Sequence, residues 1–155
     1  MGLPEIPLRL FQAMHRHLDP EAYSILLAWH RGAPCAGVLT TRSGASYWLD
    51  YAGAASERIP RGTMQLLYWR AVQAASEKGC SEFSFGRTDP RQEGLIAYKR
   101  HWNCVESELC EFRNTAKPLP NGHAGGSRTS VARTLLRYLP YPLYRLASGI
   151  IYQHR

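Results

Sequence analysis

The chain has 155 residues, 45% of them hydrophobic and 20% charged, which is an ordinary composition for a soluble domain with one proper core. It has no apolar run of the roughly 18 residues that a membrane span needs, and its start, MGLPEIPLRLF, lacks the basic and long apolar regions of a signal peptide. Ile6 also breaks a myristoylation motif, so we expect a cytoplasmic protein, and its net charge of +7 suggests an anionic partner.

The first half of the chain predicts one helix followed by three strands. Leu8–Leu18 is expected to be helical and to end at Asp19-Pro20. Its expected inward positions are Leu8, Phe11 and either Ala13 or His15. The strands are expected at Tyr23–Arg31, Cys35–Arg42 and Tyr47–Tyr51. Turn residues separate the strands, so we expect an antiparallel meander.

The second half predicts a long helix after a loop over residues 52–62. Thr63 is the expected N-cap and Gly79 the expected stop. The inward positions of this helix are expected to be Met64, Leu67, Tyr68, Ala71, Val72 and Ala75. Three further elements are expected: a strand Phe83–Phe85, a short helix carrying Leu95, Tyr98 and Trp102, and a last strand Val105–Phe112. Asn103 ends the short helix and is expected in the left-handed region.

The stretch from Gly79 to Cys104 carries a spaced motif between an aromatic strand and a basic helix. Its residues are Phe85-Gly86-Arg87-Thr88-Asp89-Pro90, Gly94, Tyr98-Lys99 and Trp102. This motif resembles the C-terminal GNAT-like domain of the Fem-type transferases, which include peptidoglycan-bridge aminoacyltransferases and FemAB-like proteins of exopolysaccharide loci. Fem proteins usually carry two such domains, and this chain has room only for the second.

The resemblance implies an α+β fold of the acyl-CoA N-acyltransferase type. We expect a mostly antiparallel mixed sheet flanked by helices over residues 1–113, a linker over 114–127 and a basic amphipathic helical tail over 128–155. The order of the predicted elements agrees with that fold but also with other α+β arrangements.

Two residues of the motif are candidates for catalysis. The resemblance implies that Lys99 polarises the acyl carbonyl or holds a phosphate of the donor. Tyr98 is a candidate proton donor to the leaving group. The alternatives are a solvated surface lysine and a tyrosine that packs in the core with Trp102.

Eight further residues are candidates for binding. The substrate-binding candidates are Arg87, Asp89, Arg100 and Tyr51, with a local ion pair in the turn as the alternative reading of Arg87 and Asp89. The donor-binding candidates are Arg58, Arg61, Gly62 and Thr63, because the free N–H groups and the dipole at a helix start suit a phosphate. The donor is either acyl-CoA or an aminoacyl-tRNA, and no metal is expected: Cys35, Cys80, Cys104 and Cys110 lack ligand spacing.

The excess of positive charge lies entirely at the end of the chain. Residues 1–111 hold 12 basic and 12 acidic residues, whereas residues 112–155 hold seven basic residues and no acid. Over 128–155 four tyrosines accompany the basic residues, which indicates either docking on the domain or binding to an anionic surface at the inner membrane face. No module for sequence-specific nucleic-acid binding accompanies the tail.

Together these features predict an acyl or aminoacyl transferase that acts on an amine or hydroxyl of a cell-envelope or exopolysaccharide precursor. The alternative is a non-catalytic half-domain that binds a membrane or a partner enzyme through its tail. A second GNAT-like half, or a second copy of the chain, is an expected partner in either case.

Overall fold

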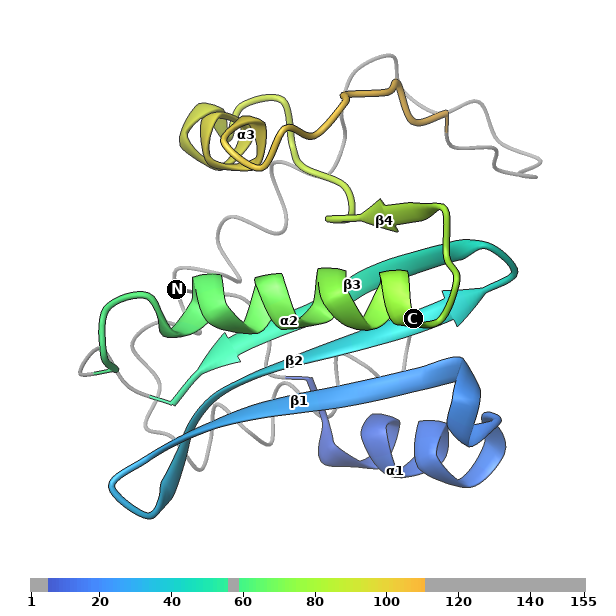
Figure 1. Cartoon of the computed structure of the whole chain (residues 1–155), viewed down its shortest axis with the longest axis vertical. Coiled ribbons are helices and arrows are strands. Elements are labelled where there is room, and N and C mark those ends of the chain that lie inside the picture. Colours follow the sequence, from blue (N-terminus) through green and yellow to red (C-terminus); the bar gives the residue numbers. More distant parts are fainter. Residues whose placement is uncertain (1–5, 56–58, 111–155) are drawn as a thin grey trace, which may run out of the picture. The chain divides into compact units, whose positions relative to one another are not determined.

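Three antiparallel strands form the centre of the structure, a computed structural model that describes residues 6–55 and 59–110 (Figure 1). The strands are β1 (Tyr23–His30), β2 (Ala33–Ser43) and β3 (Ser46–Ala54), which confirms the predicted meander. Tight connections are possible because Arg31 (φ 51°), Gly32 (φ 78°) and Gly44 (φ 58°) adopt left-handed backbone conformations.

The described residues belong to two units. One unit spans Leu18–Cys110 and contains the sheet, and the helix α1 (Leu8–His17) belongs to the other. The predicted helix is therefore confirmed, but Leu8, expected to face inward, is 59% exposed. A single turn of 3-10 helix, η1 (Pro20–Ala22), follows, and the Asp19 side chain accepts a hydrogen bond from the Glu21 backbone N–H at 2.9 Å.

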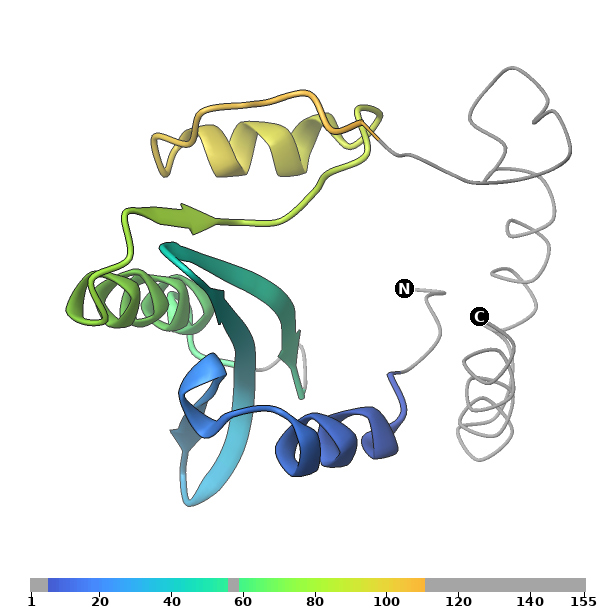
Figure 2. The ribbon, with the colours of Figure 1, turned by 90° about the vertical axis from the view of Figure 1, so that its right-hand side faces the viewer.

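A long helix covers one face of the sheet and leads to a parallel fourth strand (Figure 2). This helix, α2 (Thr63–Glu77), is the crossover between β3 and β4 (Glu82–Ser84), and such a connection is what parallel neighbours require. Only Ser46–Trp48 of β3 pair with β4, and the strand order is β1-β2-β3-β4. The sheet is therefore mixed but mostly antiparallel, as expected.

The core lies between α2 and this face of the sheet. Its buried centre is formed by Ala36, Val38 and Leu67, with Leu26, Ala28, Leu49, Met64 and Tyr68 packed against it. These residues alternate along the strands and recur at helical spacing along α2, so burial follows the two expected periodicities. Beside the core, the buried Thr40 hydroxyl donates a hydrogen bond to the Tyr47 hydroxyl at 3.0 Å, which satisfies a polar pair away from water.

The short helix α3 (Glu93–Arg100) follows β4 and has no fully buried side chain. A turn continues it to Asn103, whose φ of 57° confirms the predicted left-handed position. The predicted strand Val105–Phe112 is wrong for its described part: residues 104–110 have no regular structure, and Val105 is 94% exposed. The apolar residues of this stretch alternate as in a strand, but no strand among the described residues pairs with it.

The predicted linker, 114–127, and tail, 128–155, lie outside the described residues.

Candidate functional site

The site begins where β3 and β4 separate. Their last paired residues are Trp48 and Ser84, and β3 continues to Ala54. Just past Trp48 the register between β2 and β3 shifts, so that Asp50 is an extra residue on β3, and its Oδ2 accepts a hydrogen bond from the Thr41 hydroxyl at 2.6 Å. A bulge bends a strand, and here it redirects β3 at the point where β4 leaves it. The candidate residue Tyr51 directly follows the bulge and is partly buried.

Four aromatic rings join α2, the end of β4 and α3 in what we call the aromatic cluster: Tyr68, Phe85, Tyr98 and Trp102. Tyr68 is at its centre, with ring centroids 5.8 Å from Phe85, 6.3 Å from Tyr98 and 6.2 Å from Trp102. Edge-to-face pairs at such distances are favourable. Burial, and to a lesser extent the neighbouring Tyr98, raises the pKa of Tyr68. The cluster therefore packs α3 against α2.

The Lys99 ammonium connects α3 to the turn after β4. Its Nζ donates hydrogen bonds to the backbone carbonyls of Phe85 and Gly86, both at 2.7 Å. Burial lowers the pKa of Lys99, and the nearby Cys104 thiol partly offsets that effect. An ammonium has three donors; among the described residues two of them bond to the backbone, which leaves one for a ligand. The structure thus gives Lys99 a positioning role beside its predicted role in catalysis.

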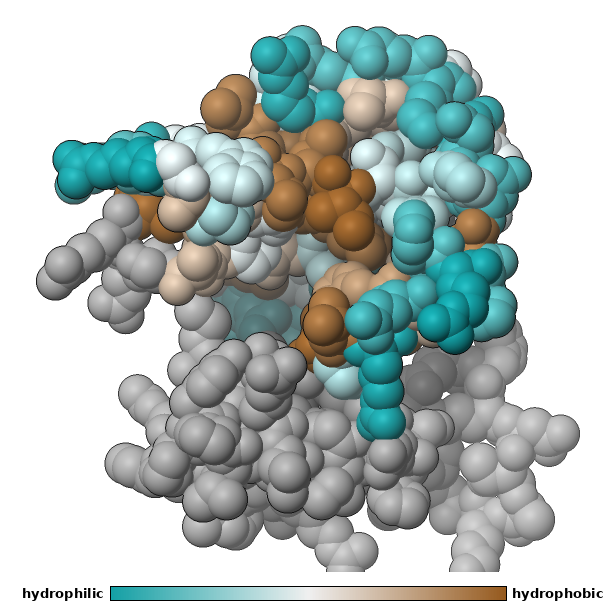
Figure 3. Space-filling model, turned by 90° about the horizontal axis from the view of Figure 1, so that it is seen from below, coloured by the Kyte–Doolittle hydropathy of each residue, from teal (hydrophilic) through white to brown (hydrophobic). Residues whose placement is uncertain are grey.

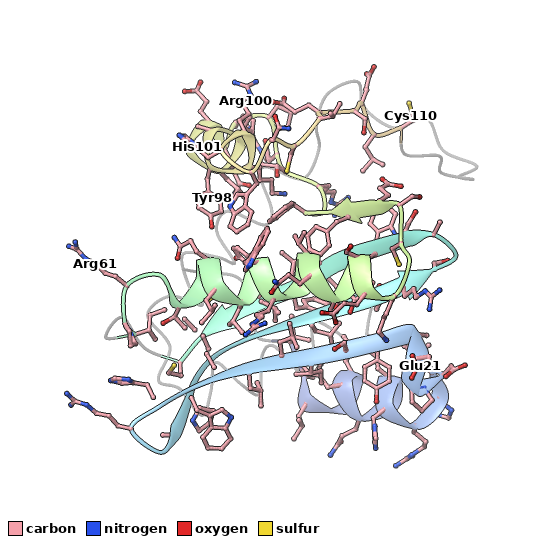
Figure 4. The ribbon with its side chains drawn as sticks, in the orientation of Figure 1. Glu21, Arg61, Tyr98, Arg100, His101 and Cys110 are labelled. Atoms are coloured by element: carbon pink, nitrogen blue, oxygen red, sulfur yellow. The ribbon has the colours of Figure 1, made fainter. Side chains whose placement is uncertain are left out.

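Two hydroxyl groups in this region are buried without a hydrogen-bond partner among the described residues. They are the Tyr98 hydroxyl on α3 and the Thr88 Oγ1 in the turn before it. Figure 4 shows Tyr98 on the side of α3 that faces α2. An unsatisfied buried hydroxyl costs about 1–3 kcal/mol, so such groups are natural contacts for a ligand.

The charged candidates around α3 form local pairs rather than one cluster. Asp89 binds Arg91, with distances of 3.0 Å from Nε to Oδ1 and 2.6 Å from Nη2 to Oδ2, so the turn holds its own ion pair. Arg100 pairs with Glu106 on the opposite side of α3 from Tyr98 (Figure 4). The Arg87 side chain is exposed. The structure does not bring Arg87 and Arg100 together with Asp89.

The start of α2 provides the other candidate surface. Its N-cap is Gly62 (φ 82°) and not Thr63 as predicted, because the Thr63 hydroxyl donates to the Pro60 carbonyl at 2.7 Å. No side chain in the described part of the chain caps the helix, so N–H groups of its first turn are suited to bind an anion. Arg61 is exposed and extends from the loop just before the helix (Figure 4). Arg58 lies outside the described residues.

Sequence reasoning missed the central position of Tyr68 and the buried hydroxyl of Thr88. Tyr68 appeared only as one of several inward positions on its helix, and helical spacing does not say which inward residue faces a later element. Thr88 lies in the motif between the charged candidates Arg87 and Asp89. Its position in this turn was the only sequence feature that could have marked it as a site residue.

The fold and the match of a family model identify the class. The model, described as an acetyltransferase (GNAT) domain, matches residues 1–100, and the chain belongs to this family. The mixed four-stranded sheet flanked by helices is the GNAT fold, so that expectation is confirmed. The narrower Fem-type resemblance stays a prediction, and a search of curated proteins found no match.

Solved structures with the same fold include aminoglycoside acetyltransferases. The enzyme AAC(6')-Iy, in complex with a CoA-containing bisubstrate analogue, is 17% identical with a TM-score of 0.59, over 74% of this chain and 84% of that one. An aminoglycoside acetyltransferase from an uncultured soil sample is 16% identical with a TM-score of 0.52, over 68% and 74%. A transcriptional regulator from Bacillus halodurans is 14% identical with a TM-score of 0.57, over 71% and 77%. At these identities the likeness establishes the fold alone.

The described residues lack two further features. They contain no group of three or more side chains suited to hold a metal ion. None of the helices in the described part of the chain is long and apolar enough to cross a membrane.

Proposed function

We propose that the protein transfers an acyl group from a CoA thioester to an amine or hydroxyl acceptor. The observation that carries this proposal is the divergence of β3 from β4 at the Asp50 bulge, close to the aromatic cluster and within a GNAT domain. Two similar structures were solved with CoA or a CoA-containing analogue, which favours acyl-CoA over aminoacyl-tRNA as the donor.

The donor would be held at two places. Its pyrophosphate suits the start of α2, where Gly62 leaves the helix without a side-chain cap and Arg61 adds a positive charge. Its extended pantetheine arm suits the part of β3 beyond Trp48, because a strand that outlasts its neighbour offers main-chain groups to an extended ligand. Together these features support a phosphate-bearing donor with a long flexible arm.

The acyl group would be transferred by direct attack. The acceptor nitrogen or oxygen forms a bond to the thioester carbonyl carbon, the carbon–sulfur bond breaks, and the acceptor loses one proton while the CoA thiolate gains one. Tyr98 is the candidate donor of that proton, because its hydroxyl is buried near the cluster and has no hydrogen-bond partner among the described residues. Lys99 holds the turn that carries Thr88 and leaves one N–H for the developing oxyanion.

Donor binding is tested by calorimetry with CoA, with acetyl-CoA and with an aminoacyl-tRNA. We expect CoA and acetyl-CoA to bind and Arg61→Ala to weaken both about tenfold, the loss of one charge-assisted contact to a phosphate. Arg70→Ala is the matched control, since Arg70 lies on the same helix but bonds to Gln73 at 3.3 Å. Binding of the aminoacyl-tRNA alone would overturn the choice of donor.

The acceptor is tested by release of CoA over a panel of compounds. The Fem-type resemblance directs the panel to amino sugars and peptidoglycan or exopolysaccharide precursors, and the similar solved structures add aminoglycosides. We expect turnover with an envelope precursor, and Tyr98→Phe to lower kcat about a hundredfold for every accepted compound. Turnover only with aminoglycosides would contradict an envelope precursor as the acceptor but would still support acyl transfer from CoA.

The second candidate function is a binding module attached through its tail, and the unbalanced charge of the chain end favours it. Residues 112–155 carry seven basic residues and no acid. We expect the full chain to co-sediment with vesicles that contain anionic lipid, and a chain without residues 117–155 to stay in solution. Equal pelleting of the two chains would remove the membrane hypothesis.

A further inference from the structure

We propose that Trp48 and Asp50 of β3 bind the acceptor and select compounds that carry a protonated amine. This inference rests on the proposed acyl transfer and goes further, because that proposal leaves the acceptor as any amine or hydroxyl. It begins from the place where β4 leaves β3. Trp48 forms the last pair between the two strands, with Ser84, and Asp50 is the extra residue of the bulge just beyond it.

The side chains of Trp48 and Asp50 lie on the face of the sheet opposite α2. Thr40 of β2 pairs with Leu49 of β3, and Leu49 packs against the core under α2. Successive side chains of a strand point to opposite faces, so Thr41 and Trp48, which also pair, lie on the other face. The Thr41 hydroxyl donates to Asp50 Oδ2 at 2.6 Å, which holds the carboxylate on that same face.

Thr41 is therefore the common neighbour of an indole ring and a carboxylate. Opposite side chains of an antiparallel pair have Cβ atoms about 4.5–5.5 Å apart, so one ligand can reach both groups. Within residues 6–55 and 59–110, the Thr41 hydroxyl is the only group bonded to the Asp50 carboxylate, and the Trp48 ring has no aromatic or ionic contact. Asp50 is exposed and Trp48 is 42% exposed, so Oδ1 and part of the ring can accept a ligand.

A carboxylate beside an indole ring is suited to a protonated amine. The carboxylate accepts charge-assisted hydrogen bonds from an ammonium, and the face of an indole attracts a cation within about 6 Å of the ring centre. A neutral hydroxyl can donate one hydrogen bond to the carboxylate but gains nothing comparable from the ring. The pair of side chains therefore favours a cationic acceptor over a neutral one.

The position of the pair suits the proposed reaction. The pantetheine arm of the donor is proposed to lie along β3 beyond Trp48, with its pyrophosphate at the start of α2. Asp50 belongs to this part of β3, but its carboxylate is on the face away from α2. An acceptor held there by its ammonium would bring a second amine, uncharged, or a hydroxyl to the thioester carbon at the end of the arm.

Apolar exposure alone does not mark a binding site in this molecule. Figure 3 looks from below, the side on which β1 is the lowest strand in Figure 1, and shows apolar side chains gathered in the middle of that side. Trp29 of β1 is 64% exposed, more than Trp48, but the strand sequence YSILLAWH contains no carboxylate. Trp48 differs because a carboxylate and the end of the β3–β4 pairing lie beside it.

Calorimetry of the full chain, with and without CoA, tests the proposal. The probes are neamine, an amino sugar that is cationic at neutral pH, and its fully N-acetylated form, which is neutral. We expect neamine to bind at least about tenfold more tightly than the neutral form, and Asp50→Asn to remove that preference, since an amide can keep the Thr41 bond but carries no charge. Trp48→Leu should weaken neamine about threefold.

Two matched controls accompany these variants. Glu82→Gln removes a carboxylate that likewise accepts from a hydroxyl, that of Ser46 at 3.0 Å, at the opposite end of the β3–β4 pairing. Trp29→Leu removes an exposed indole from β1. We expect both controls to bind neamine as the wild type does, and all four variants to keep the wild-type Tm, because the substituted side chains are exposed.

The outcomes separate this inference from the acyl-transfer proposal. Equal affinity for the two forms of neamine, no binding of either, or a loss in Asp50→Asn no larger than in Glu82→Gln overturns the acceptor site. Acyl transfer to neutral acceptors at the same rate in wild type and Asp50→Asn also overturns it, and leaves the reaction standing. Binding of neamine that depends on Asp50, without any release of CoA from acetyl-CoA over the acceptor panel, refutes the reaction and keeps the cation site.

Discussion

Replacing Lys99 by methionine tests whether the ammonium positions the turn after β4. The substitution keeps the length of the side chain and removes its hydrogen bonds to the Phe85 and Gly86 carbonyls, both of which are 2.7 Å long. A hydrogen bond to a charged group contributes about 1.5–3 kcal/mol, and the bond to the exposed Gly86 oxygen contributes less than the other. We therefore expect a loss of about 2 kcal/mol in the free energy of unfolding, which for a chain of this size lowers Tm by about 4–8 °C.

Calorimetry of the wild type, Lys99→Met and Lys78→Met gives the comparison. Lys78 is a matched control, because its ion pair with Glu21, at 3.2 Å, lies at the surface and contributes at most about 1 kcal/mol. A Tm of Lys99→Met no lower than that of Lys78→Met would refute the positioning role. An unchanged Tm with a loss of turnover of 100-fold or more would instead place the ammonium at the acyl carbonyl, as removal of an oxyanion donor costs about that factor.

Three further substitutions test other contacts. Burial raises the pKa of Tyr68 above its usual 10.0, so the contribution of Tyr68 to stability is complete below pH 10 and is lost as the pH rises through the folded pKa. In melting curves recorded at increasing alkaline pH, Tyr68→Phe should lack this loss of stability. An equal fall of Tm with pH in the wild type and the variant would contradict the prediction. Thr40→Val leaves the buried Tyr47 hydroxyl without its donor and should cost about 1–3 kcal/mol in denaturant unfolding, whereas adding Tyr47→Phe should recover part of that cost; an additive double variant would argue against the pair. Gly86→Ala should cost about 1–2 kcal/mol in the same assay because Gly86 has a φ of 69°, and a neutral result would mean that the turn relaxes.

The sequence predicted the elements whose signals are local. The three strands of the meander, α2 and the left-handed Asn103 followed from alternation, helical spacing and turn residues, and all are confirmed. The N-cap of α2 was wrong by one residue because a threonine hydroxyl can bond to a preceding carbonyl as well as to a following N–H, and Thr63 does the former. The strand predicted from Val105 onward was wrong for a different reason. Alternating apolar residues form a strand only where a neighbouring strand is available for pairing.

The candidate site was predictable as a region and not as a set of contacts. The motif located Tyr98 and Lys99 correctly on a helix next to an aromatic strand. That Lys99 donates to two backbone carbonyls, and that Asp89 pairs with Arg91 rather than Arg87, depends on side-chain geometry that spacing does not fix. The roles predicted for these residues stay predictions.

The parallel pairing of β3 with β4 has a consequence for the order in which the domain assembles. The strands of the meander Tyr23–Ala54 pair with their neighbours in sequence, whereas Ser46 of β3 pairs with Glu82 of β4, and the whole of α2 lies between them in the sequence. Contacts between residues that are distant in sequence form slowly. The β4 strand pairs with β3 over only three residues, and α3 is held chiefly by the aromatic cluster and the Lys99 ammonium, so we expect β4 and α3 to open first in native-state hydrogen exchange. A region that detaches while the meander stays intact would give a bulky donor a way in and its product a way out.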